Sequence, residues 1–192
     1  MMRYVLASGS PRRKELLGKV VKDFEIIIPE GEEITDSTEP DEIVKELSFQ
    51  KASEIFHKIL TGDIVVIGAD TVVSYNHKVL GKPSDKKNAR EMIEQLQGNT
   101  HQVYTGVTLF YRIDGREECV TFCEETHVDV AKMDDDEIDA YVATDEPDDK
   151  AGAYGVQGLF AIYINGIRGD YYNVVGLPIS RLYKEMRLKG LL

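Results

Sequence analysis

The segment DIVVIGAD, residues 63–70, constrains the fold more than any other stretch of the chain. Its apolar residues follow one another without the polar residue at every second position that marks a half-exposed strand. Such a run, closed by Gly-Ala-Asp, is typical of a central strand that is covered on both faces. We therefore expect a sheet with packing elements on each side.

Helices alternate with strands in the first half of the chain, and hairpins dominate the second half. This order predicts an α/β fold with a mixed, twisted sheet and flanking helices, not a doubly wound one. No repeat or linker divides the chain, so residues 1–192 are expected to form one domain. The predicted elements are strands before Ser8 and at 24–28 (buried), 63–70, 102–113 and 117–130; helices from Pro11 and at 40–60, 85–97, 134–143 and 178–189; and hairpins at 71–83, Asp114-Gly115 and Asn165-Gly166.

The formal net charge is −11. Nucleic acids and anionic membranes bind basic faces, so we expect neither as a partner, and an anionic ligand would need a local cationic pocket. We expect no signal peptide, and no apolar run approaches the ~18 residues of a membrane span. Cys119 and Cys123 lack redox or zinc spacing, which predicts reduced thiols and a cytoplasmic location.

Two arginines, Arg12 and Arg13, lie in the first turn of a helix that Ser10 caps and Pro11 begins. Cations are disfavoured there because the helix macrodipole is positive at its N-terminus. One interpretation is a solvated helix start that tolerates this repulsion. The other is a phosphate site, in which the hydroxyls of Ser8 and Ser10 and a forked guanidinium bind the anion.

Lys51 falls on the apolar stripe of the helix at 40–60, near Val44 and Leu47. A lysine on a core-facing stripe is costly unless its ammonium reaches water or meets an anion. Reaching water is the common outcome. An anionic partner would mean that the helix directs a cation into a cleft.

Asp70 closes the apolar run, and we expect the strand to end there. Ligand sites in α/β sheets lie beyond the carboxyl ends of strands, so a carboxylate at this position is well placed for chemistry. The alternative is a turn aspartate that caps the next backbone N–H.

Further candidates lie in loops. Glu32 and Glu33 belong to an acidic loop and Lys82 to a Gly-Lys-Pro loop, where solvated surface charges are the ordinary explanation. Gln157 lies in DKAGAYGVQG, whose glycines let the backbone approach a flat ligand. The chain has no Walker loop, nucleophile elbow or HExxH motif. Dispersed cations and carboxylates with an anion-competent helix start indicate a metal-assisted phosphate site.

Six segments together resemble the Maf family of nucleoside triphosphate pyrophosphatases: LASGSPRRKELL, GADTVV, GKP, HQVYTGV, DEPDDKAGAYGVQG and NVVGLP. The resemblance implies a mixed α/β fold of two lobes around a deep cleft, related to inosine triphosphate pyrophosphatases. It implies a cytoplasmic enzyme that releases pyrophosphate from nucleoside triphosphates with Mg²⁺ or Mn²⁺. GADT with GAYGVQG resembles the branch that acts on dTTP and UTP.

The resemblance also implies roles for individual residues. Asp70 matches the catalytic carboxylate that accepts a proton from water, and Arg12, Thr71 and Gln157 match positions of substrate selection. The expected phosphate contacts are Ser8, Ser10, Arg13, Lys51 and Lys82, and the expected metal ligands are Asp70, Glu33 and Glu32.

Base choice has a chemical rationale. Uracil and thymine present N3–H beside O4, and the amide of Gln157 can accept from one and donate to the other. Tyr154 or loop backbone would hold the amide in that orientation.

Two alternatives stay open at this point. One is the same chemistry on another base, a modified pyrimidine or 7-methyl-GTP. The other is a non-enzymatic regulator of cell division or septum formation, processes to which the family has been linked. A homodimer is an expectation drawn only from the frequency of symmetric dimers among small enzymes.

Overall fold

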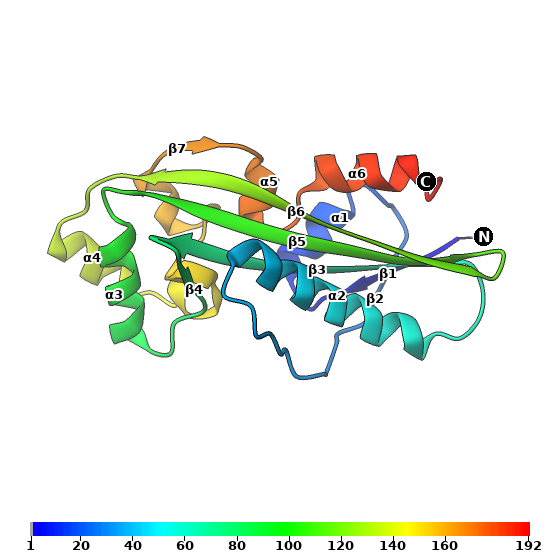
Figure 1. Ribbon diagram of the computed structural model, residues 1–192. Helices are drawn as coiled ribbons and strands as arrows, with labels where there is room; N and C mark the ends of the chain where they lie inside the picture. The colour runs from blue at the N-terminus through cyan, green and yellow to red at the C-terminus, as the bar shows by residue number, and fades with distance from the viewer. Residues whose placement is uncertain (1) are drawn as a thin grey trace.

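The computed structural model describes residues 2–192, and within them one sheet of seven strands runs the length of the molecule (Figure 1). Its order is β2-β1-β3-β5-β6-β7, with β4 beside the end of β3. β1 pairs in parallel with β2 and β3, and the other pairs are antiparallel, so the predicted mixed sheet is confirmed. The strands are β1 (Arg3–Ala7), β2 (Glu25–Ile26), β3 (Ile64–Tyr75), β4 (Lys78–Leu80), β5 (Thr100–Ile113), β6 (Arg116–Val130) and β7 (Ile164–Arg168).

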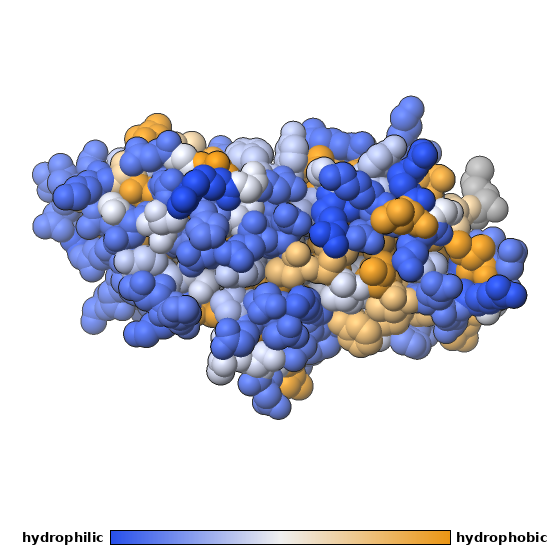
Figure 2. All heavy atoms as spheres, turned by 45° about the horizontal axis from the view of Figure 1, so that its top comes forward, coloured by the Kyte–Doolittle hydropathy of each residue, from blue (hydrophilic) through white to orange (hydrophobic). Residues whose placement is uncertain are grey.

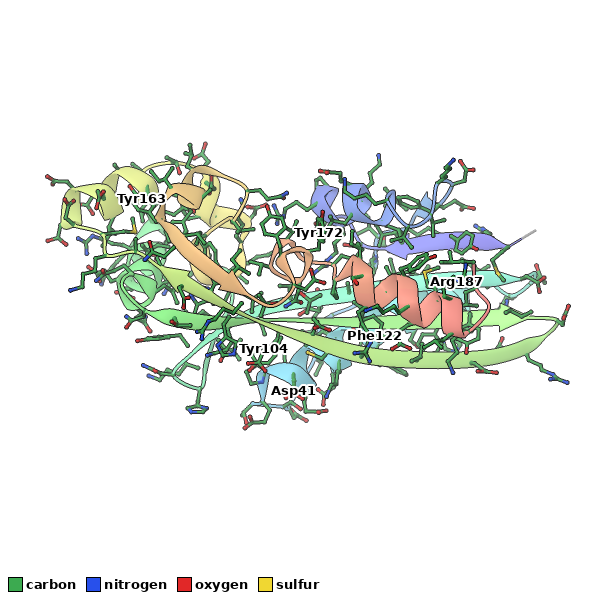
Figure 3. The ribbon with its side chains drawn as sticks, turned by 90° about the horizontal axis from the view of Figure 1, so that it is seen from above. Asp41, Tyr104, Phe122, Tyr163, Tyr172 and Arg187 are labelled. Carbon is green, nitrogen blue, oxygen red and sulfur yellow. The ribbon has the colours of Figure 1, made fainter. Side chains whose placement is uncertain are left out.

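Helices form two lobes along this sheet. α1 (Pro11–Leu17) and α6 (Ile179–Leu188) pack over one end with a core that includes Leu6, Ile67 and Leu182. α3 (Lys86–Leu96), α4 (Asp135–Val142) and the 3₁₀ turns η1 (Glu146–Asp149), η2 (Ala151–Ala153) and η3 (Leu159–Tyr163) surround a second core at the other end. In Figure 3, Phe122 and Arg187 mark the first lobe and Tyr163 the second.

The face in Figure 2 is largely hydrophilic, with its apolar residues in separate groups. This agrees with a chain whose long apolar segments are inside the two lobes. In the described part of the chain, no helix is both long enough and apolar enough to cross a membrane.

α2 (Pro40–Lys58) covers the opposite face of the sheet at unusually close range (Figure 1). A Cβ on Gly106 of β5 would lie 2.2 Å from the Val44 carbonyl oxygen, and one on Gly68 of β3 would lie 2.4 Å from that of Ser48. The helix backbone therefore rests directly on two strands, because neither strand carries a side chain at the contact.

β3 continues to Tyr75, so the prediction that its strand ends at Asp70 was wrong. The antiparallel partner β5 is paired with β3 from Ile64 to Ser74 and keeps it extended through both lobes. The strand that ends near Asp70 is β1, which lies on the edge of β3 opposite β5. β1 is paired with β3 only up to Gly68, and β4 joins at Val73.

Other predicted elements differ in detail. β2 is only two residues long and lies at the sheet edge, where Ile26 is 40% exposed, so the buried strand at 24–28 was wrong. Asn165 and Gly166 lie inside β7 and form no turn, and the helix α5 (Tyr171–Val175) was missed. The turn at Asp114-Gly115 is confirmed, with both residues at positive φ.

Replacing Gly106 with alanine should force α2 away from β5. We expect a loss of about 1–3 kcal/mol in the free energy of unfolding, the usual cost of overpacking, measured by urea denaturation. Gly166→Ala in β7 is the matched control, since its Cβ would meet Asp129 only at an ordinary 3.6 Å. Equal stability of the two variants would show that α2 does not rest on the β5 backbone.

Candidate active site

A cavity of about 1280 Å³ lies beside the part of β3 that pairs with neither β1 nor β4. It lies where the sheet passes from one lobe to the other. Every candidate site residue selected from the sequence lines it: Ser8, Ser10, Arg12, Arg13, Glu32, Glu33, Lys51, Asp70, Thr71, Lys82 and Gln157.

Asp70 and Thr71 point to opposite faces of the sheet, as successive strand residues do. Asp70 faces α2, where it meets Lys51, and Thr71 faces α1, where it meets Arg13. Both reach the same cavity because β3 has a partner on only one edge at this point. The missing strand thus joins two faces of the sheet into one site.

Lys51 meets an anion, so its place on the apolar stripe is explained by a cleft and not by solvent. Its Nζ lies 2.6 Å from Asp70 Oδ1 and 3.0 Å from Glu33 Oε1. The side chains of Lys51 and Asp70 are only 14% and 12% exposed. A charge pair this sheltered from water interacts strongly and holds both groups in place.

Arg13 is held by neutral acceptors. Its Nε donates to the Gly176 carbonyl oxygen at 2.9 Å. Its Nη2 donates to Thr71 Oγ1 at 3.0 Å and its Nη1 to Ser8 Oγ at 3.4 Å. Burial lowers the pKa of Arg13 from its ordinary value, and the nearby Asp70 carboxylate opposes that shift. Because a guanidinium has five N–H donors, two remain for a ligand.

The Thr71 hydroxyl makes two hydrogen bonds within the protein. Thr105 Oγ1 donates to the Asn173 carbonyl oxygen at 2.9 Å and lies 2.9 Å from Thr71 Oγ1. A hydroxyl has one proton, so Thr71 must donate to Thr105 while it accepts from Arg13. Thr71 therefore has no proton to offer a ligand, and it helps to hold Arg13 in position.

Two serine hydroxyls beside Arg13 keep their protons free for an anion. Ser10 caps α1 as predicted, since its Oγ accepts from the backbone N–H of Arg13 at 3.4 Å. Ser8 Oγ accepts from the backbone N–H of Ser10 at 3.2 Å and from Arg13. Both oxygens act as acceptors in these bonds, so each O–H can donate to a phosphate oxygen.

The remaining candidates line the more open parts of the cavity. Arg12 lies 3.9 Å from the Asp149 carboxylate, while Lys82 and Gln157 are exposed. Tyr154 does not hold the Gln157 amide as expected, because its hydroxyl is 2.7 Å from Nε2 of the buried His101. Burial lowers the pKa of His101 to about 4, so this imidazole is neutral at pH 7.

Three residues missed by sequence reasoning attach the acidic loop to α2. They are Glu46, Gln50 and Glu54, spaced four apart on one helix face. Glu54 accepts the backbone N–H groups of Glu30 and Gly31, each at 3.0 Å. Gln50 bonds to both backbone groups of Ile34, and Glu46 to the hydroxyls of Thr35 and Ser37. This ladder sets Glu33 beside Lys51.

The carboxylates of Asp70 and Glu33 are the groups here that suit a hard cation. Both contact one ammonium, so they lie near each other. Mg²⁺ takes oxygen ligands and usually binds one or two carboxylates together with substrate phosphates. Within residues 2–192, no three His, Cys, Asp or Glu side chains are grouped to hold a metal, so Asp70, Glu33 and Glu32 do not form a complete site by themselves.

The fold has a relative among solved structures. The Staphylococcus aureus Ham1 protein aligns with a TM-score of 0.51 and 13% identity, over 97% of this chain and 99% of that chain. At this identity the likeness shows the fold alone, and it agrees with the predicted mixed sheet with flanking helices.

The family is shown by sequence. A family model described as "Maf-like protein" matches residues 3–188, and the chain belongs to this family. A protein of Agathobacter rectalis named dTTP/UTP pyrophosphatase is 50% identical over 203 residues, covering 99% of this chain and 98% of its own. A Bacillus anthracis protein of the same name is 50% identical over 188 residues, covering 97% and 95%.

The attachment of the acidic loop predicts a pH dependence. Lys58, with the N–H groups of Glu30 and Gly31, lowers the pKa of Glu54 to about 2 from an ordinary value of 4.5. A lowered folded-state pKa stabilises the protein above pH 4.5, and this contribution is lost as the pH falls toward 2. We expect Glu54→Gln to be less stable than the parent at pH 7 and the difference to shrink at pH 3, measured by urea unfolding. A pH-independent difference would contradict this assignment.

Proposed function

We propose that the protein is a nucleoside triphosphate pyrophosphatase that hydrolyses dTTP and UTP to the nucleoside monophosphate and pyrophosphate. The observation that carries the proposal is the cavity at the open edge of β3. There, in a chain of net charge −11, Lys51 pairs with Asp70 on one face of the sheet and Arg13 bonds to Thr71 on the other. The two relatives at 50% identity, both named dTTP/UTP pyrophosphatase, support the same substrate class.

The polar end of the cavity suits the triphosphate. Arg13 offers two free N–H donors, Ser8 and Ser10 offer hydroxyl protons, and Lys82 is exposed at the cavity wall. Fixed donors of this kind oppose the charge that develops on a pyrophosphate leaving group without having to reorganise. The bonds to Gly176 and Thr71 keep the Arg13 guanidinium in position as that charge forms.

Asp70 acts on the attacking water. The carboxylate orients the water and takes its proton while the water oxygen bonds to the α-phosphorus. The bond from that phosphorus to the bridging oxygen breaks, and pyrophosphate leaves. Lys51 holds the Asp70 carboxylate in place at the cavity by its 2.6 Å contact.

We also propose that Asp70 and Glu33 hold a divalent cation, Mg²⁺ or Mn²⁺. When bound, such an ion supplies charge neutralisation on the phosphates and a more acidic water. The support is that both carboxylates line the cavity and lie near each other, each in contact with the Lys51 ammonium.

Apolar side chains in the cavity wall suit the flat face of a base. Val73, Val103, Tyr154 and Val156 contribute apolar surface to this wall. Gln157 also lines the cavity. Its side chain is exposed, so the amide is free to pair with N3–H and O4 of uracil or thymine.

The proposal includes a cytoplasmic location, supported by the free thiols of Cys119 and Cys123. The homodimer stays a prediction, for which sedimentation equilibrium is the test.

Product analysis tests the chemistry. With Mg²⁺ or Mn²⁺, we expect dTTP and UTP to give the nucleoside monophosphate and pyrophosphate on anion-exchange chromatography. Asp70→Asn should lower kcat by about 10²–10⁴, the usual contribution of a general base. Asp41→Asn, on α2 and paired with Lys45 outside the cavity, is the control. Release of the diphosphate and phosphate would contradict the proposal. No turnover of any nucleotide would favour the regulatory alternative.

A second test concerns base recognition. Gln157→Ala should reduce the ratio of kcat/KM for UTP over CTP much more than it reduces the rate of phosphate chemistry, because only the base contact is removed. Gln95→Ala, on the exposed side of α3, is the control. An equal loss for all nucleotides, purines included, would exclude a role for Gln157 in selection.

A further inference from the structure

The carboxylate of Glu146 is enclosed by the loop that carries Gln157. Its Oε2 accepts the backbone N–H of Leu159 at 2.6 Å, and its Oε1 accepts that of Phe160 at 3.3 Å. The hydroxyl of Tyr141 lies 3.2 Å from the same Oε1 and 3.2 Å from the Ala153 carbonyl oxygen, so its single proton is shared between these two acceptors. Leu159 and Phe160 begin η3, and the first N–H groups of a helix have no partner within it. Glu146 therefore caps η3 from η1.

The backbone of Gly158 lies so close to this carboxylate that a Cβ there would displace it. A Cβ there would be 2.1 Å from Glu146 Oε2, and its three nearest atoms would all belong to that carboxyl group. Its φ of −103° is ordinary, so a side chain at this position would act on the Glu146 carboxylate and not on the backbone conformation. Gly155 precedes Gln157 by two residues. A Cβ on Gly155 would lie 2.8 Å from Lys150 Cε.

Both ends of this turn are anchored. The N–H of Gly158 donates to the Gly155 carbonyl oxygen at 3.1 Å, which closes the turn around Gln157. Phe160 is fully buried, with its ring centroid 4.9 Å from those of Tyr141 and Tyr154. Lys150 Nζ donates to the Glu146 carbonyl oxygen at 2.8 Å.

We propose that Glu146 is a positioning residue that determines base selectivity by fixing the turn Gly155–Gly158. Glu146 lines the cavity, and its two carboxylate oxygens accept the N–H groups that follow the turn, so we assign its action to the position of Gln157. The inference rests on the proposed function, because it assumes that Gln157 contacts the base. A charged acceptor makes shorter and stronger bonds to N–H donors than a neutral one, which suits a turn that must be held still.

Steady-state kinetics of Glu146→Ala with UTP and CTP test the proposal. We expect the UTP-over-CTP ratio of kcat/KM to fall by about tenfold, the effect of ~1.4 kcal/mol, mostly through a higher KM for UTP. Glu146→Gln keeps one acceptor oxygen and should recover part of the ratio. Asp148→Ala is the matched control, since Asp148 lies on η1, is exposed and pairs with Lys86.

A double-mutant cycle isolates the contact. Gly158→Ala should lower the ratio in the parent, because its Cβ meets the Glu146 carboxylate. In the Glu146→Ala background, Gly158→Ala should lower the ratio little further, because the carboxylate that its Cβ would contact is absent. An unchanged ratio in Glu146→Ala, or equal effects of Gly158→Ala in both backgrounds, would overturn the proposal.

Amide hydrogen exchange gives a readout that does not depend on turnover. In Glu146→Ala the amides of residues 155–160 should exchange faster than in the parent, while those of α6 should not change. If the parent fails to hydrolyse UTP, the proposed function fails, and exchange still decides whether Glu146 holds the turn. Unchanged exchange would overturn the proposal by itself.

Discussion

The site depends on one interruption in hydrogen bonding along β3. Between Ala69 and Val72 this strand is paired with β5 alone, because β1 has ended and β4 has not begun. Side chains on successive residues point to opposite faces, so a continuous sheet would separate Asp70 from Thr71. The missing neighbour lets both line one cavity and lets α1 and α2 contribute cations to it from opposite sides.

The two central cations are held in different ways, and this difference suits phosphate chemistry. Lys51 is paired with two carboxylates, so much of its charge is balanced within the protein. Arg13 is held by the hydroxyls of Ser8 and Thr71 and by one carbonyl oxygen, all neutral. A buried ion pair is weak evidence for stability, since desolvation offsets the attraction. The burial of Lys51 and Asp70 as an ion pair is therefore better explained by their contacts with a ligand than by a contribution to stability.

Much of the site could be predicted from the sequence, because local anomalies marked it. Two arginines at a helix start, a lysine on an apolar stripe and an aspartate after an apolar run all line the cavity. The end of β3 could not be predicted, because it depends on pairing with β5, a strand distant in the sequence in which Gly106 pairs with Asp70. Asn165-Gly166 favours a turn by itself, yet pairing with β6 keeps it extended. Glu46, Gln50 and Glu54 are spaced like an ordinary solvated helix face. Only their hydrogen bonds to the acidic loop show that they hold this loop against α2.

A crystal structure of Asp70→Asn with UTP and Mg²⁺ tests most directly whether one cavity at the open edge of β3 holds the nucleotide. We predict phosphate oxygens in contact with both Arg13 and Lys51, so that the triphosphate lies across the edge between Ala69 and Val72, with the base beside Gln157. A nucleotide bound on one face of the sheet only, touching Arg13 without Lys51 or Lys51 without Arg13, would contradict this.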